Sequence, residues 1–380
     1  MDFSNALTNT YTLVFFVLLC VSLVVLSLYY GLTLLRVATH KGKNLPDSSA
    51  LSVSDLPPVS VVLVAHNESE FLKESLPYLL EQDYPNFEVV VVDYTSRDDT
   101  QFVLQVCSEN YPNLKAISFP EDVNMFKGKK YPLSIGIKSA KNDVILLTEP
   151  GCVPKDFGWI REMVCGYMHG ASAVLGYSLL KDGKGLLALL QQYENMMFGA
   201  SYLGMALLGN PYTATGRNLS FRRDFFFSHG GFISHYSISE GADDLFVNQN
   251  VTRSNSTVVL HEKAAVEADV NSTFSLWHED RRARFVTRHL YGLKDKLILL
   301  AYPLSLVIFI LVLVLLWVGG LFPWQLLAAV LGLKIVWQVI CTALYGKRFK
   351  IKVVQFLSPI FEIYFLFANT ILYLFTLRRK

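Results

Sequence analysis

Long apolar stretches lie near both ends of the chain, and a mixed pattern fills the middle. Residues 11–35 and residues 297–333 each contain no charged side chain. About 20 apolar residues suffice for a helix to cross the hydrocarbon core of a bilayer. We therefore expect an N-terminal membrane anchor at 11–36. Glycine and proline at 319–323 divide the second stretch into two expected spans, at about 297–319 and 323–345.

A last apolar stretch covers 353–377 and ends in three cations, Arg378-Arg379-Lys380. Pro359 lies inside it and would remove a helical hydrogen bond. The stretch is therefore either a third C-terminal span, an interfacial piece with a short span, or a re-entrant segment. The C-terminal membrane region, 297–377, is expected to contain two to three spans.

Cations indicate which side of the membrane the middle of the chain faces. Arg36, His40, Lys41 and Lys43 follow the first span directly, and a basic segment at 346–352 follows the third. Cytoplasmic flanks carry the excess of Lys and Arg. The domain between the anchors, 44–293, is therefore predicted to be cytoplasmic.

Two charged residues, Lys334 and Glu362, fall inside the expected spans. An isolated charge at that depth costs at least about 2.5–3.5 kcal/mol. Two interpretations stay open: the two residues pair between neighbouring helices, or one or both lie nearer an interface and extend their charged ends to it.

Strand and helix patterns alternate in the first half of the middle domain. Val59–Ala65 is a nearly continuous apolar run, typical of a strand buried on both faces. Asn67 and Glu70 have the spacing of a capping box at the start of the next helix. This alternation predicts parallel strands with helices on both faces of the sheet. The expected strands are 59–65, 87–93, 114–119 and 143–148, with a helix at 131–141.

Polar and acidic residues follow these strands, where ligands bind in open α/β sheets. They are His66, Glu68, Asp93, Tyr94, Ser96 and Glu149. No G-x-G-x-x-G follows the first strand and no Walker motif occurs, which argues against dinucleotide oxidoreductases and P-loop enzymes.

The second half has a different pattern. The segment 185–209 is apolar with few charges, and it lies either on a membrane interface or against the protein core. Thr215–Arg223 is typical of a strand that leads into a turn. Gly241–Asn248 opens a helix with two carboxylates in its first turn, and 277–291 is a basic helical stretch.

Composition supports a membrane protein and excludes a nucleic-acid-binding one. Hydrophobic residues make up 52% of the chain and charged residues 17%, and the net charge is +2. Such a small charge provides no basic field for nucleic acid. The five cysteines show no C-x-x-C pair, so they are expected to be reduced packing residues.

Six motifs in order resemble family 2 glycosyltransferases, most closely the bacterial membrane-anchored branch that includes polysaccharide synthases. They are V-A-H-N-E (64–68), V-V-D-Y-T-S (91–96), K-G-K-K (127–130), L-L-T-E-P-G-C-V-P (146–154), G-R-N-L-S (216–220) and G-A-D-D-L-F (241–246). The resemblance implies an α/β protein: a GT-A domain with a Rossmann-like mixed sheet, flanked by transmembrane helices in the bacterial inner membrane. It also implies sugar transfer with inversion from a nucleotide-diphosphate sugar to a polysaccharide or lipid-linked acceptor.

The resemblance also suggests roles for single residues. Asp243 aligns with the general base, with Asp244 beside it, and Arg217 and Arg281 would lie near the acceptor or the diphosphate. Glu149 aligns with the first carboxylate of the Asp-X-Asp motif, the family's Mg²⁺ or Mn²⁺ site. The implied nucleotide-sugar contacts are His66, Glu68, Asp93, Tyr94, Ser96, Lys129, Lys130 and Glu149.

Several motif positions depart from the family pattern. Tyr94 stands where the family commonly has Asp, Gly151 replaces the second carboxylate of the metal motif, and Ala242 precedes the base. Asp280 and Ala283 align with the Gln and Arg of the Q-x-x-R-W motif. An active transferase is the favoured interpretation. An inactive scaffold subunit of a cell-surface polysaccharide assembly, another nucleotide-dependent fold, or a membrane channel or transporter are the alternatives.

Overall fold

The computed structural model describes residues 10–42, 45–46, 48–119, 128–351 and 354–377. The chain divides into two compact units. One contains residues 40–291, and the other contains residues 1–39 together with 292–380. Lys43, Lys127, Lys352 and the terminal residues 378–380, which entered the sequence analysis, lie outside the described residues.

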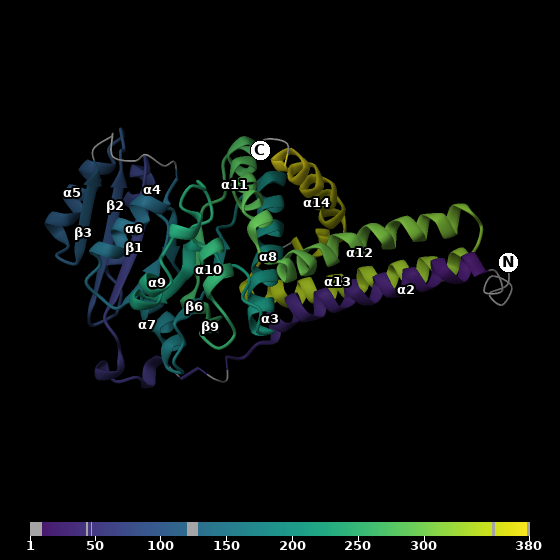
Figure 1. Ribbon diagram of the computed structural model, residues 1–380, viewed down its shortest axis with the longest axis horizontal. Coiled ribbons are helices and arrows are strands. Elements are labelled where there is room, and N and C mark those ends of the chain that lie inside the picture. The colour runs from purple at the N-terminus through teal and green to yellow at the C-terminus, as the bar shows by residue number, and fades with distance from the viewer. Residues whose placement is uncertain (1–9, 43–44, 47, 120–127, 352–353, 378–380) are drawn as a thin grey trace. The chain divides into compact units, whose positions relative to one another are not determined.

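The first half of the 40–291 unit is built on four parallel strands (Figure 1). Strand β1 lies between β2 and β4 and is parallel to both. The order in which strands are added to the sheet therefore reverses at β1. Val61, Val62 and Leu63 have no solvent exposure, as the apolar run predicts. The strands are β1 (Val59–Ala65), β2 (Phe87–Tyr94), β3 (Leu114–Phe119) and β4 (Val144–Leu147).

Three helices cover both faces of these strands: α4 (Ser69–Leu80), α5 (Thr100–Asn110) and α6 (Lys130–Ser139). Leu72 and Leu76 of α4 share one hydrophobic core with Val61 and Leu63 of β1. On the other face, a Cβ at Gly136 of α6 would lie 2.7 Å from Val62. Only glycine allows α6 to approach the sheet this closely.

The expected capping box at Asn67 does not form. Helix α4 begins at Ser69, and Glu68 at its N-cap makes no side-chain capping bond. Asn67 Oδ1 instead accepts a hydrogen bond from the Arg97 amide at 2.7 Å, and Glu70 pairs with Lys73. Asn67 therefore joins two loops at the end of the sheet, because tertiary contacts compete with local capping.

The second half adds antiparallel strands and a small sheet. The main sheet has the order β3-β2-β1-β4-β8-β6-β9, and the small one the order β5-β10-β7. The added strands are β5 (Cys152–Pro154), β6 (Ala173–Leu175), β7 (Ser178–Leu180), β8 (Leu219–Arg222), β9 (Ser256–Val258) and β10 (Val266–Ala268). The added helices are α7 (Trp159–Val164), α8 (Gly185–Leu207), α9 (Arg223–Ser228), α10 (Asp244–Asn250) and α11 (Phe274–Val286).

The order of elements expected in Thr215–Arg223 is wrong, because the turn precedes the strand. A 3₁₀ turn (Gly216–Asn218) comes first and β8 follows. Asn218 explains this order, since its buried side chain donates to the Tyr177 and Ala264 carbonyls and accepts from Trp159 Nε1. These three bonds hold the turn in the interior.

The other unit contains four helices that are long and apolar enough to cross a membrane. The first runs from α2 (Thr10–Tyr30) through a π-helical turn (Gly31–Leu35) into α3 (Arg36–Thr39). The others are α12 (Leu293–Val318), α13 (Trp324–Phe349) and α14 (Val354–Leu377). The chain therefore has three candidate C-terminal spans.

Pro359 does not interrupt α14, contrary to one of the alternatives from the sequence. Proline at this position leaves the Gln355 carbonyl without its usual helical donor. The Thr342 hydroxyl of α13 donates to that carbonyl at 3.3 Å. A neighbouring helix thus supplies the missing hydrogen bond, a known way of accommodating proline in membrane helices.

The two charges expected inside the spans form an ion pair. Lys334 Nζ donates to the Glu362 carboxylate, and both side chains are almost fully buried. The hydroxyls of Tyr30 and Tyr302 also donate to Glu362, and Lys334 donates to Gln338 at 2.8 Å. Helices α2, α12, α13 and α14 all contribute to this network.

Candidate active site

A cavity of about 600 Å³ opens beyond the carboxyl ends of β1 and β4. Its lining comes from the β1–α4 loop, the end of β4, the 216–218 turn and helices α8, α10 and α11. This is the switch point of the sheet, where ligands bind in open α/β folds. The volume lies within the range of small-molecule sites.

Half of the residues predicted for the site line this cavity together. They are Glu68, Lys129, Glu149, Arg217, Asp243 and Asp244. They come from separate parts of the chain, so only the fold brings them together.

The other predicted residues do not line the cavity, and four of them form a cluster at the neighbouring strand ends. His66 Nδ1 lies 2.5 Å from the Tyr94 carbonyl, and the Asn67 amide donates to Ser96 Oγ at 2.9 Å. Asp93 is buried and accepts from the Ser96 amide through Oδ1. Its Oδ2 atom is buried without a hydrogen-bond partner in the described structure.

Backbone geometry marks the same loops. Asn67 and Thr95 have φ angles of 55° and 53°, values that non-glycine residues rarely adopt. Such conformations concentrate at functional sites. They occur here in the loops after β1 and β2.

Glu149 lies among cations. Arg217 Nε donates to its carboxylate at 2.9 Å. Burial alone would raise the pKa of Glu149, but the charges of Lys129 and Arg217 outweigh it and lower the pKa to about 2. Glu149 is therefore ionised at any physiological pH.

The adjacent aspartates have different surroundings. Asp243 Oδ2 accepts a hydrogen bond from the Gly216 amide. Asp244 accepts from the Tyr291 hydroxyl at 2.8 Å and from the Thr287 hydroxyl. Burial, together with the charge of Asp244, raises the pKa of Asp243 to about 6. Asp244 is thus held by two side chains, whereas Asp243 has the pKa of a base that works near neutral pH.

Lys130 is directed away from the cavity. Its buried ammonium donates to the carbonyls of His235, Ile238 and Glu240, at 2.8, 2.9 and 2.5 Å. Gly128 permits this packing, because a Cβ there would lie 2.1 Å from the Ser239 carbonyl oxygen. Lys130 therefore fixes the segment that leads into Asp243, which a pattern of adjacent lysines could not reveal.

We expect Lys130→Met to destabilise the protein by about 2 kcal/mol, because three carbonyls lose a charged donor. Segment 235–240 should also become more sensitive to proteolysis. Chemical unfolding and limited proteolysis in detergent measure both effects. Lys129→Met is the matched control, since Lys129 makes none of these bonds; equal destabilisation by the two variants would contradict this role.

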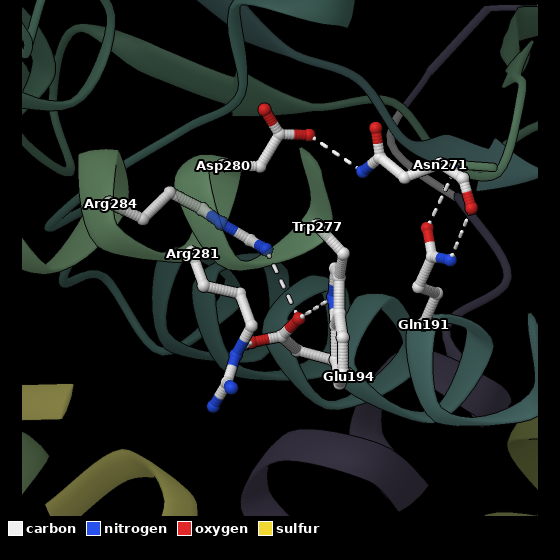
Figure 2. Close-up of polar contacts among 7 residues, drawn as sticks. All are labelled: Gln191, Glu194, Asn271, Trp277, Asp280, Arg281 and Arg284. Atoms are coloured by element: carbon white, nitrogen blue, oxygen red, sulfur yellow. Dashed lines mark hydrogen bonds and ion pairs between the residues drawn. The ribbon is translucent and has the colours of Figure 1, made fainter. Parts of the chain in front are cut away.

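A second cluster connects α8 and α11 (Figure 2). Glu194 accepts hydrogen bonds from Trp277 Nε1 at 2.8 Å, from Arg281 Nε at 2.9 Å and from Arg284 at 3.2 Å. The Arg281 side chain is only 3% exposed and does not line the cavity. Arg284 does line it.

The side chain of Gln191 extends this connection. It donates to the Asn271 carbonyl at 3.0 Å and accepts from the Asn271 amide at 2.7 Å, and Asn271 bonds Asp280. Sequence reasoning missed Glu194 and Arg284 as site residues. The available signal was Glu194 itself, the single charged residue of α8.

Helix α8 thus has a polar face on the cavity, at Gln191, Glu194 and Asn195. This agrees with the interpretation that 185–209 lies against the protein core. A contact of the same helix with a membrane stays a prediction.

Known proteins with similar sequences are glycosyltransferases. The protein named "Probable glycosyltransferase YdaM" of Bacillus subtilis is 29% identical over 152 residues, 39% of this chain and 36% of that protein. The poly-β-1,6-N-acetyl-D-glucosamine synthase of Staphylococcus epidermidis is 25% identical over 162 residues, 42% of this chain and 38% of that protein. The matches therefore span less than two fifths of these relatives.

A solved structure shares the fold over most of the chain. The mannosyltransferase PcManGT of Pyrobaculum calidifontis, solved with GDP-Man and Mn²⁺, has a TM-score of 0.58 and 19% identity. The match covers 90% of this chain and 98% of that one. The mixed sheet is therefore of the GT-A type.

The motifs led to a resemblance with family 2 enzymes, and the family model that matches is also one of glycosyltransferases. Its description is glycosyl transferase family 21, and the match runs from residue 18 to residue 372. The chain therefore belongs to glycosyl transferase family 21.

Proposed function

We propose that this protein is an active membrane-bound transferase that moves a sugar from a nucleotide-diphosphate donor to a polysaccharide or lipid-linked acceptor, with inversion. One observation carries the proposal: the Asp243 carboxylate borders the cavity, is held by the Gly216 amide and has its pKa raised to about 6. This combination suits a general base for an acceptor hydroxyl.

In the proposed reaction, Asp243 takes the proton of the acceptor hydroxyl. At the same time, the oxygen of that hydroxyl attacks the anomeric carbon of the sugar. The bond from that carbon to the diphosphate oxygen breaks, and its electron pair leaves with the diphosphate. Attack from the side opposite the leaving group inverts the anomeric centre. The protein contributes position and charge stabilisation.

The nucleotide would lie toward the ends of β1 and β2. Support comes from buried Asp93, whose Oδ2 atom has no hydrogen-bond partner among the described residues. Glu68 borders the cavity, and burial raises the pKa of Glu68. In this proposal, His66, Tyr94 and Ser96 shape the nucleotide pocket through their loop contacts.

We also propose a different alignment of the basic motif on α11. If it is shifted by one residue, Arg281, Arg284 and Phe285 occupy the Gln, Arg and Trp positions of Q-x-x-R-W. The position of Arg284 on the cavity supports this register. The arginine of the motif is then retained as Arg284, with Arg281 in place of Gln and Phe285 in place of Trp.

The bacterial cytoplasmic membrane, with residues 44–293 on the cytoplasmic side, is the proposed location. Support comes from the four apolar helices and from the cations after Thr39 and at Lys347, Arg348 and Lys350. Donor nucleotide sugars are cytoplasmic molecules. The staphylococcal relative, a poly-β-1,6-N-acetyl-D-glucosamine synthase, supports a glycan acceptor.

A transfer assay tests this proposal. Detergent-purified protein is incubated with a panel of UDP and GDP sugars and a bacterial lipid extract, and nucleotide release and labelled glycolipid are measured. Release with one donor that depends on the extract supports the transferase. Folded protein that releases no nucleotide with any donor would favour the scaffold subunit.

We expect kcat/KM to fall about tenfold per pH unit below pH 6 and to be flat above it, because the base must be ionised. The raised pKa means that ionisation of Asp243 opposes folding, so protonation there does not unfold the protein. Activity loss near pH 6 therefore reports on the base. Asp244→Asn removes the neighbouring charge and should move the inflection to lower pH; an inflection unchanged by that variant would contradict the assignment.

A further inference from the structure

The residues at the family's metal position do not fit a divalent cation. Glu149 is the single carboxylate there, because Gly151 replaces the second one. Its charge is already compensated by Arg217 at 2.9 Å and by Lys129. Among the described residues, no group of three or more His, Cys, Asp or Glu side chains could hold a metal ion. Mg²⁺ and Mn²⁺ require several oxygen ligands.

Three cations surround Glu149 instead. Lys129 precedes helix α6, Arg217 lies on the 216–218 turn, and Arg284 lies on α11. All three line the cavity, and the charge of each lowers the pKa of Glu149. The side chains of Arg217 and Arg284 are 27% and 36% exposed, so a ligand in the cavity can reach them.

Glu194 orients Arg284 from the other side. Glu194 accepts a hydrogen bond from Arg284 at 3.2 Å. The central carbon of the Arg284 guanidinium lies over the Phe198 ring, 5.6 Å from the ring centroid. The same carboxylate bonds Arg281, which is stacked on Trp277 at 4.9 Å. A guanidinium has five N–H donors in a fixed plane. Held by one of them, Arg284 can present others to an anion.

We propose that Lys129, Arg217 and Arg284 bind the donor diphosphate without a divalent cation. Glu149 is then the anion that holds the cations together, and Glu194 is a positioning residue for Arg284. The inference rests on the proposed function, because it assigns the diphosphate part of that same site. Arginine and lysine are well suited, since they make charge-assisted bonds to phosphate oxygens.

The same three cations also stabilise the leaving group of the reaction. As the bond to the anomeric carbon breaks, its electron pair adds negative charge to the diphosphate. Fixed positive groups at that point stabilise the charge without a metal.

Calorimetric titration of the full-length protein in detergent with UDP and with GDP tests the proposal. Each titration is run in EDTA, in Mg²⁺ and in Mn²⁺. We expect the Kd in EDTA to lie within about threefold of the values with metal. Lys129→Met and Arg284→Gln should each weaken binding by about tenfold or more, because each removes a charge-assisted bond.

Two further variants make the test specific. Arg282→Gln is the matched control, because Arg282 is an exposed neighbour that does not line the cavity. It should leave the Kd unchanged. Glu149→Gln separates the two roles of Glu149. Loss of a metal ligand would abolish binding, whereas the Gln amide oxygen can still accept the hydrogen bond from Arg217, so the Kd should stay within a fewfold of the original. Abolished binding in this variant would overturn the anchoring role.

Three outcomes of the titrations would contradict the proposal at different points. Binding that is lost in EDTA and restored by Mn²⁺ would overturn the metal-free site while supporting the proposed function. Metal-independent binding that neither Lys129→Met nor Arg284→Gln weakens would overturn the assignment of the cations. Folded protein that binds neither nucleotide in any condition would overturn the proposed function itself.

Discussion

Replacing Asp243 with Asn is expected to lower kcat by about a hundredfold to ten-thousandfold, the usual contribution of a general base. The Asn side chain has nearly the same shape, and its oxygen can still accept the hydrogen bond from the Gly216 amide. It cannot take a proton from the acceptor. Initial rates of nucleotide release, measured with saturating donor and acceptor, give the effect.

Binding and folding should survive this substitution. The buried carboxylate has a raised pKa, so removing its charge relieves a cost and should not lower the unfolding temperature. The Kd for nucleotide should stay within a fewfold of the original. Asp224→Asn, on helix α9 and away from the cavity lining, is the control. If Asp243→Asn kept more than a tenth of the original kcat, Asp243 would not be the base.

Replacing Glu362 with Leu is expected to destabilise the protein by about 3–5 kcal/mol, the usual effect of breaking a buried ion pair. Lys334 would be left buried inside the helical unit without its anion. The Tyr30 and Tyr302 hydroxyls would lose their acceptor as well. Thermal unfolding in detergent, followed by tryptophan fluorescence, measures the loss, because three of the five tryptophans lie in the helical unit.

Removal of both charges provides the matched control. Lys334→Met combined with Glu362→Leu leaves no buried charge, so it should recover most of the lost stability. The exchange Lys334→Glu with Glu362→Lys should recover part of it, because the pair can form in reverse. A double variant no more stable than Glu362→Leu alone would show that the pair is not what the single variant breaks.

Several features of the fold could be predicted from local sequence. The apolar run Val59–Ala65 is a fully buried strand, and the strand at 114–119 has the expected bounds. The pairing of Lys334 with Glu362 was one of two open interpretations, and it forms. For Val59–Ala65 the cost of exposing apolar surface dominates over other effects, and for Lys334 and Glu362 the cost of leaving a charge unpaired in an apolar environment does.

The sequence was less informative wherever a polar side chain had more than one possible partner. Asn67 has the spacing of a helix cap but bonds the Arg97 amide. Lys129 and Lys130 are adjacent and chemically identical, yet one borders the cavity and the other holds three carbonyls. Only the packing of segment 128–130 against segment 235–240 distinguishes them.

By itself, the sequence determined the apolar spans, the parallel strands and the acidic residues at the strand ends, because burial of apolar surface depends on short-range patterns. The tertiary structure alone decided that Arg217 forms an ion pair with Glu149. It also decided that Asp243 and Asp244 have different hydrogen-bond partners. Finally, it decided that the Glu194 carboxylate holds Arg284 at the cavity. Hydrogen bonds and ion pairs act over a few ångströms between residues far apart in the chain. Their partners are therefore set only when the fold brings the side chains together.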